Sequence, residues 1–266
     1  MTLLIPSLLG AFCYLIAGGL QAASLSGKRP EKRPLVMGLG AVALLLHTFA
    51  VYHVLHTDDG IQLALFPVSS LIAWLVAGLV LASSLRKPLT NLFVAIFPLA
   101  AITLLLAMWV PPSAPAHQLE PGIIGHILTS ILAYSIFTIA AVQAFLLAAQ
   151  EHQLKHHHTR GIVKALPPLQ LMEQLLFEMV WTGIILLTVS LISGFLFLDD
   201  IFAQHLVHKT VLSLVAWLLF ACLLWGRHQW GWRGRVAIRW TLGGFLFLML
   251  AYFGSKVVLE LLLPLD

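Results

Sequence analysis

Eight long, continuous runs of apolar residues are the feature that most constrains this chain. They cover about residues 2–23, 35–56, 62–84, 89–110, 122–149, 174–198, 206–226 and 237–262. Each run is long enough to cross the roughly 30 Å hydrocarbon core of a bilayer as a helix. A membrane β-barrel would instead need alternating polar and apolar residues. The sequence therefore predicts an all-α fold: a polytopic membrane bundle of about eight transmembrane helices, forming a single domain over residues 1–266.

Charged residues are too few to cover a water-facing surface. They make up 10% of the 266 residues, whereas 60% of the residues are hydrophobic. A soluble domain has about 25% charged residues, so this composition excludes an ordinary soluble enzyme. The net charge of +4 is therefore interpreted through membrane topology, and no nucleic-acid partner is expected.

The charges in the predicted loops alternate along the chain. The loops after the first, third, fifth and seventh runs carry basic residues: Lys28, Arg29, Lys32, Arg33, Arg86, Lys87, Lys155, Arg160, Lys164, Arg227, Arg233 and Arg235. The other loops have no Lys or Arg and carry Asp58, Asp59, Glu120, Asp199 and Asp200. Because basic loops stay in the cytoplasm, both termini are predicted on the periplasmic side of a bacterial inner (plasma) membrane.

Histidines within the apolar runs are the candidate functional residues. His47 lies in the middle of the second run, where an interhelical hydrogen bond or ligation of a metal or haem iron would satisfy its ring. His126 lies about one turn inside the fifth run, and His208 lies at a similar depth on the seventh. His205 is either a substitute for His208 or an interfacial residue. Equal depth is the first requirement for two imidazoles that share one haem iron. We therefore select His126, His47 and His208 as candidate haem-binding residues.

The other polar patterns indicate little chemistry. No nucleophile with a base, paired carboxylates, zinc-protease motif or phosphate loop is present, so the chain is not expected to be an enzyme and no metal site is assigned. The run at 155–158 is expected to be a solvated basic loop facing anionic lipid, with a metal site as the alternative. Lys256 and Glu260 are expected to form a surface ion pair at i,i+4 spacing.

Four stretches carry a resemblance to a known family. They are Gly125-His126-Ile127-Leu128-Thr129-Ser130-Ile131-Leu132-Ala133-Tyr134, His208-Lys209-Thr210 running to Ala216-Trp217, Gly231-Trp232-Arg233-Gly234-Arg235, and Ala251-Tyr252-Phe253-Gly254-Ser255. In order and spacing they resemble the cytochrome c assembly (CcsA-like) membrane proteins, in particular the short HemX/YpjD-like branch of bacterial inner-membrane proteins. The resemblance is strongest over residues 120–256.

The resemblance implies a relation to haem. Larger members of the family hold haem with a tryptophan-rich external segment and flanking histidines. His126 matches the first of these histidines and Lys209 matches the lysine that closes the segment, but the tryptophans are absent here. The resemblance therefore implies haem binding or haem transit across the inner membrane during cytochrome biogenesis, with the lipid bilayer, haem and other membrane proteins as partners.

Two other functions remain open. One is a non-catalytic membrane regulator or scaffold, acting on another membrane protein or on tetrapyrrole synthesis. The other is a small-solute transporter, which the scarcity of charge within the apolar runs disfavours.

Overall fold

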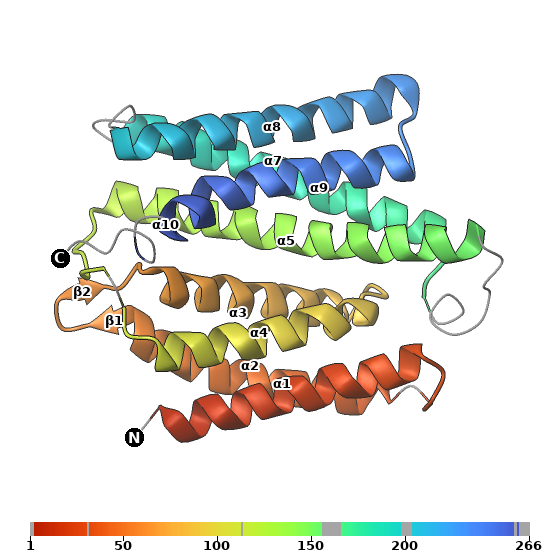
Figure 1. Ribbon diagram of the computed structural model, residues 1–266, viewed down its shortest axis with the longest axis horizontal. Helices are drawn as coiled ribbons and strands as arrows, with labels where there is room; N and C mark the ends of the chain where they lie inside the picture. The colour runs from red at the N-terminus through yellow and green to blue at the C-terminus, as the bar shows by residue number, and fades with distance from the viewer. Residues whose placement is uncertain are drawn as a thin grey trace. The chain divides into compact units, whose positions relative to one another are not determined.

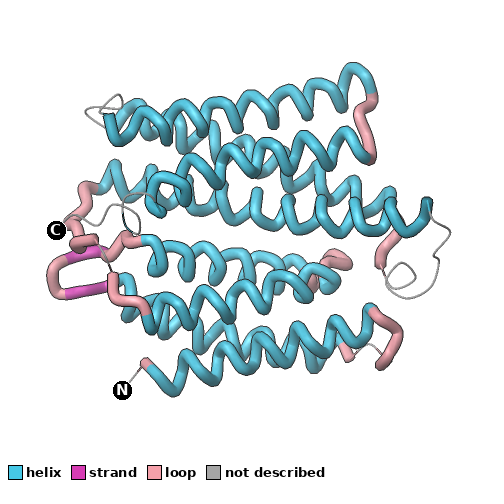
Figure 2. Tube along the Cα trace, viewed as in Figure 1, coloured by secondary structure: helices cyan, strands magenta, loops and turns pink. Residues whose placement is uncertain are grey.

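The eight predicted spans form helices. The computed structural model describes residues 3–30, 32–112, 114–155, 166–197, 204–257 and 260, with the side chains of 204–206 left out. The long helices, shown in Figures 1 and 2, are α1 (Leu4–Leu25), α2 (Arg33–Leu55), α3 (Leu65–Ser83), α4 (Phe93–Trp109), α5 (Pro121–Lys155), α7 (Leu169–Phe197), α8 (Gln204–Trp230) and α9 (Arg235–Met249). Shorter elements are η1 (Thr90–Leu92), η2 (Leu250–Gly254), α10 (Ser255–Val257) and the strands β1 (His56–Thr57) and β2 (Gly60–Ile61).

Each predicted span corresponds to a helix long and apolar enough to cross a membrane. The all-α, multi-span fold is therefore confirmed. The fifth helix is longer than predicted, because it continues to Lys155, and the next long helix starts earlier than predicted, directly after Pro167 and Pro168. The histidine run at 156–158 and the segment 198–203 lie outside the described residues.

The chain forms two compact units. The N-terminal unit comprises Met1–Gln118 and His152–Pro168, and the C-terminal unit comprises Leu119–Glu151 and Leu169–Asp266. The first contains α1 to α4, and the second contains most of α5 together with α7, α8 and α9. The single domain expected over residues 1–266 stays a prediction.

Small residues let the helices of the N-terminal unit approach closely. The helix α1 contacts α2 and α4, and α3 contacts α2 and α4. At Gly40 on α2, an added Cβ would lie 2.7 Å from the ring of Phe97 on α4. Phe97 in turn stacks on Phe93, with ring centroids 4.3 Å apart. Because lipid gives helices no hydrophobic reason to associate, close packing of this kind is what holds a membrane bundle together.

One end of the N-terminal unit is closed by a short hairpin. The strands β1 and β2 pair antiparallel, and Ile61 forms backbone hydrogen bonds with His117 in the loop after α4. Gly60 has a φ of +131°, and a Cβ there would lie 2.6 Å from the carbonyl oxygen of His117. Only glycine fits both the conformation and the space. The hairpin therefore ties together the connections that follow α2 and α4.

An aromatic stack fills the centre of the C-terminal unit. Phe137 of α5 and Phe220 of α8 are both fully buried, with ring centroids 3.9 Å apart and planes 11° apart. Gly183 of α7 lies against the ring of Phe137 and Gly244 of α9 lies against the ring of Phe220. A Cβ added at either glycine would lie 2.7 Å from a ring carbon. The four helices of the unit therefore meet around one apolar, tightly packed pair of rings.

Candidate functional site

His126 lies in the second turn of α5, where it faces α7. Its Nδ1 is 2.9 Å from the carbonyl oxygen of Ser190 and 3.3 Å from the hydroxyl of Ser193. The ring is half-buried. Both partners belong to α7, so the contact joins two helices within the C-terminal unit.

The contact with Ser190 sets the tautomer of the His126 ring. A carbonyl oxygen only accepts hydrogen bonds, so Nδ1 must carry the proton and donate it. In the neutral imidazole the lone pair is then on Nε2. Metal-ligating histidines have this arrangement: one nitrogen donates to a carbonyl and the other is left for the metal. Nε2 of His126 is therefore free of the proton and can accept a hydrogen bond or ligate a metal.

Small and hydroxylated residues surround this ring. Gly194 of α7 lies directly beside it, and an added Cβ would sit 3.0 Å from Cε1 of His126. The hydroxyl groups of Ser130 and Ser190 are 2.6 Å apart, and Ser130 also donates to the carbonyl oxygen of His126 at 2.7 Å. This part of the α5–α7 interface is therefore polar, in contrast to the apolar stack deeper in the same unit.

A tyrosine hydroxyl interrupts the backbone hydrogen bonds of the last long helix. The hydroxyl of Tyr134, on α5, donates to the carbonyl oxygen of Leu248. In an α-helix this carbonyl oxygen would accept from the backbone N–H of Tyr252. Residues 250–254, directly beyond, form a π-helical turn. The insertion explains why the helix widens at this point.

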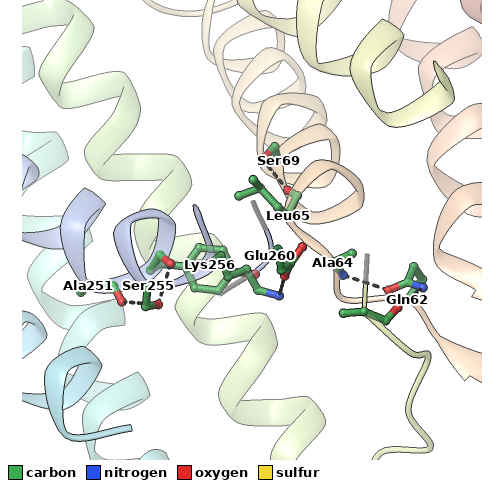
Figure 3. Close-up of polar contacts among 10 residues, drawn as sticks. Gln62, Ala64, Leu65, Ser69, Ala251, Ser255, Lys256 and Glu260 are labelled. Atoms are coloured by element: carbon green, nitrogen blue, oxygen red, sulfur yellow. Dashed lines mark hydrogen bonds and ion pairs between the residues drawn. The ribbon is translucent and has the colours of Figure 1, made fainter. Parts of the chain in front are cut away.

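Aromatic and charged side chains gather at this widened turn. Tyr252 and Phe253 both lie edge-on to the ring of Tyr134. Lys256 donates to Glu260 at 2.8 Å, as Figure 3 shows. The predicted i,i+4 pair is therefore confirmed, but its expected surface position is wrong: the two side chains are only 16% and 9% exposed. The aromatic rings of the turn pack beside them, and the ammonium group of Lys256 lies 5.8 Å from the centre of the Tyr252 ring.

The structure places the other two candidate histidines differently. His208 is exposed on α8, next to the half-buried Lys209. The described hydrogen bonds of the His126 ring reach α7, and none of them joins it to His208. The pairing of these two rings on one iron stays a prediction.

His47 is enclosed by the helices of the N-terminal unit. Its ring is fully buried, and its Nε2 lies 2.9 Å from the hydroxyl of Ser70 on α3. The interhelical hydrogen bond that the sequence offered as one explanation of His47 is therefore confirmed. Its ring also meets Tyr14 of α1 edge-on, with centroids 5.8 Å apart. A haem at this ring would require these helices to separate.

A buried carboxylate organises the corner between α8 and α9, which sequence reasoning missed. Glu173 of α7 is 3% exposed. It accepts from Arg227 at 2.8 Å, from Arg233 at 3.4 Å and from the backbone N–H of Gly234 at 3.4 Å. Two arginines and one amide around a single carboxylate form a charged cluster that fixes the loop 231–235. The available signal in the sequence was Glu173 itself, an acidic residue near the start of a long apolar helix.

Comparison with known proteins identifies the family. The sequence profile described as cytochrome C assembly protein matches residues 35–263. The chain belongs to the cytochrome c assembly protein family. It is 31% identical over 259 residues to the inner membrane protein YpjD of Escherichia coli (strain K12), which covers 96% of this chain and 98% of that relative. A 28.8 kDa protein of Azospirillum brasilense is 31% identical over 157 residues, covering 56% and 58% of the two chains. No solved structure matches.

Family membership agrees with a multi-pass protein of the bacterial inner membrane. Eight candidate spans and a relative with that location support this assignment. The family match covers helices of both units, from α2 to the last described residues. The four stretches that carried the resemblance all lie in the C-terminal unit, where they include His126, the arginine corner and the π-helical turn.

Proposed function

We propose that this member of the cytochrome c assembly protein family binds haem in its C-terminal unit, where Nε2 of His126 would hold the iron. The observation that carries the proposal is the contact between Nδ1 of His126 and the carbonyl oxygen of Ser190 at 2.9 Å. This contact leaves a lone pair on Nε2, which is what haem iron accepts from a histidine.

Other residues of the same unit support an anionic, flat ligand. Haem carries two propionates, and the half-buried Lys209 is a basic group that would pair with one of them. Tyr134, Tyr252 and Phe253 add aromatic surface. When bound, haem would supply iron chemistry, while the chain holds and orients it. The proposed role is handling or transit of haem during cytochrome biogenesis, without catalysis by side chains.

Two further parts of the proposal rest on the sequence alone. His208 is the proposed second ligand, because its position in the sequence gives it a depth on α8 similar to that of His126 on α5. Both termini are proposed to lie on the periplasmic side, as the loop charges indicate. His47 is the weakest of the three haem candidates, because its Nε2 is engaged with Ser70 and its ring is fully buried.

A spectroscopic experiment tests the proposal. The full chain is purified from haem-replete cells and its reduced-minus-oxidised spectrum is recorded, alongside His126→Ala, His208→Ala and His47→Leu. We expect a Soret band that His126→Ala removes, that His208→Ala shifts and that His47→Leu leaves unchanged. Gly194→Ala should weaken the band, since a methyl group there lies 3.0 Å from the His126 ring.

One result contradicts haem binding. If the wild-type protein shows no Soret band even after hemin is added to the purified sample, haem ligation is ruled out. The function that then remains is a non-catalytic membrane regulator or scaffold for another membrane protein or for tetrapyrrole synthesis. Thermal unfolding of each variant in detergent controls for loss of the fold.

A further inference from the structure

The N-terminal unit contains a row of buried polar side chains that no part of the haem proposal uses. Ser7, Tyr14 and Gln21 lie on α1 at intervals of seven residues, which places them on one face of the helix. They are only 1%, 0% and 2% exposed. The oxygen atoms of the Ser7 and Tyr14 hydroxyls and Oε1 of Gln21 have no hydrogen-bond partner among the described residues. A helix face that packs inside a membrane protein rarely carries three such groups.

The row is continued by residues of the other helices. At the level of Tyr14, His47 of α2 presents a ring whose Nδ1 has no partner among the described residues. At the end of α1 that holds Gln21, the chain passes through Ser84 and Asn91, between α3 and α4. The side chains of these two residues are also buried without described partners, and η1, which contains Asn91, contacts α1. The polar atoms therefore follow α1 along most of its length.

The chemistry at His47 requires a partner whichever tautomer is present. If Nε2 donates to Ser70, then Nδ1 is an acceptor that lacks a donor. If Ser70 donates to Nε2, then Nδ1 carries a proton that lacks an acceptor. Tyr14 meets the ring edge-on at 5.8 Å between centroids, and no described hydrogen bond joins the two side chains. A buried polar atom left without a partner costs about 1–3 kcal/mol, so several of them in one unit need a common explanation.

We propose that the N-terminal unit holds internal water molecules beside the buried polar side chains of α1, with the Tyr14–His47 pair at the central position. Water is the ligand that fits, because it both donates and accepts and bridges buried polar groups in protein interiors. Between the polar residues the same face of α1 packs closely, since an added Cβ at Gly10 would lie 3.3 Å from Leu46 and one at Gly18 would lie 3.2 Å from Pro98. The proposed water therefore lies at the polar side chains themselves. It hydrates an imidazole in mid-span, independently of the His126 site.

Radiolytic hydroxyl-radical labelling of the full chain in lipid nanodiscs tests this proposal. Radicals form from water itself, so a buried ring is labelled only where a water molecule lies beside it. The matched control is Phe137, which is as fully buried as Tyr14 but belongs to the apolar stack with Phe220. After correction for the intrinsic reactivity of the two rings, we expect Tyr14 to be labelled at several times the rate of Phe137. Equal rates would overturn the proposal.

A variant separates bound water from opening of the helices. The double substitution Tyr14→Phe with His47→Leu removes both polar atoms from the centre but keeps a reactive ring at position 14. We expect its labelling to fall to the level of Phe137. Labelling that persists would mean that bulk solvent reaches the ring when the helices open, which contradicts resident internal water.

The single variant Tyr14→Phe gives a second readout if the double variant does not fold. A hydroxyl bonded to internal water contributes to stability, so its removal should lower the unfolding midpoint. An unchanged or raised midpoint indicates a hydroxyl in a dry interior and overturns the proposal. The haem spectrum is not involved in either readout, so this inference and the haem proposal fail independently.

Discussion

The interiors of the two units differ in chemistry although both are built from four long apolar helices. At the centre of the N-terminal unit, the ring of Tyr14 meets the ring of His47, and both side chains carry polar atoms without described partners. At the centre of the C-terminal unit, Phe137 and Phe220 stack between two glycines. Hydropathy alone does not distinguish these interiors, because a single hydroxyl or imidazole hardly changes the average over a span.

The difference concerns what holds each bundle together. The C-terminal unit is closed by tight apolar packing, by the tyrosine bond to the Leu248 carbonyl and by the charged corner at Glu173. The N-terminal unit uses glycine contacts as well, but it leaves polar groups in its core. The proposed haem site at one end of the C-terminal unit would need a rigid remainder, and the aromatic stack provides it. Four sets of substitutions test the contrast.

The largest effect is expected where a charge is buried. Glu173→Gln leaves Arg227 and Arg233 around a site that has lost its charge, and it should lower the free energy of unfolding by about 3 kcal/mol. This is the low end of the usual range, because the two arginine side chains are 36% and 60% exposed. Arg33→Gln in the N-terminal unit loses only a hydrogen bond to the Ser84 carbonyl and should cost less. Reversible unfolding in mixed micelles measures both costs. Equal costs would contradict the conclusion that a buried ion-pair cluster stabilises the C-terminal unit.

The second pair compares the tightness of the two cores. Gly244→Ala and Gly40→Ala each place a methyl group 2.7 Å from a ring carbon, of Phe220 and Phe97 respectively. Each should cost about 2 kcal/mol through overpacking. Their matched controls are Gly243→Ala and Gly38→Ala, where nothing lies within 4 Å, and these should leave stability unchanged or slightly raised. A smaller cost at Gly40 than at Gly244 would show that the N-terminal core accommodates an added methyl group more easily than the C-terminal core.

The third comparison concerns a tyrosine of the C-terminal unit. Tyr134→Phe removes the hydroxyl that bonds the Leu248 carbonyl and should cost about 1 kcal/mol. It should also let Leu248 and Tyr252 form the ordinary helical bond and shorten the π-helical turn. Amide hydrogen exchange at Tyr252 measures that change directly. Slower exchange at Tyr252 in the variant is expected; faster exchange would mean that Tyr134 supports the turn rather than interrupting the ladder.

The smallest effect compares two similar tryptophan–threonine bonds. Nε1 of Trp217 donates to Thr188 at 2.8 Å in the C-terminal unit, and Nε1 of Trp74 donates to Thr48 at 2.8 Å in the N-terminal unit. Thr188→Val should cost about 0.6 kcal/mol, a typical value for a side-chain hydrogen bond inside a membrane. Thr48→Val should cost at least as much, because that bond faces lipid in mid-span, where Trp74 has no water as an alternative partner. The same unfolding assay resolves the order, and a smaller cost at Thr48 would refute the argument from lipid exposure.

The sequence predicts the helices well because a span is a local property. Length and hydropathy in a window decide it, and all eight spans are confirmed. The ion pair of Lys256 and Glu260 is predictable for the same reason, as the two residues are one turn apart. Its depth is not predictable, because the burial of these side chains depends on distant parts of the chain.

Contacts between spans are harder to predict from the sequence than the spans themselves. Equal depth suggested His126 and His208 as partners, but depth does not fix the rotation of a helix about its axis. Each residue turns the helix by about 100°, and the rotation of α5 directs His126 to α7. The cluster at Glu173 was missed because its partners lie more than fifty residues further along the chain. The insertion of Tyr134 left no local signal, since neither Leu248 nor Tyr252 is unusual in a helix.

The Glu173 cluster has a consequence for the biogenesis of the protein. Ribosomes deliver α7 to the membrane before the segment with Arg227 and Arg233 has been made, so the carboxylate must wait at the bilayer surface without its partners. The hairpin of α8 and α9 then supplies both arginines through its corner. Insertion of this last pair of helices and neutralisation of an earlier charge are therefore the same event. A chain that stops after α7 would expose an unpaired acid, a defect that a membrane quality-control protease can recognise.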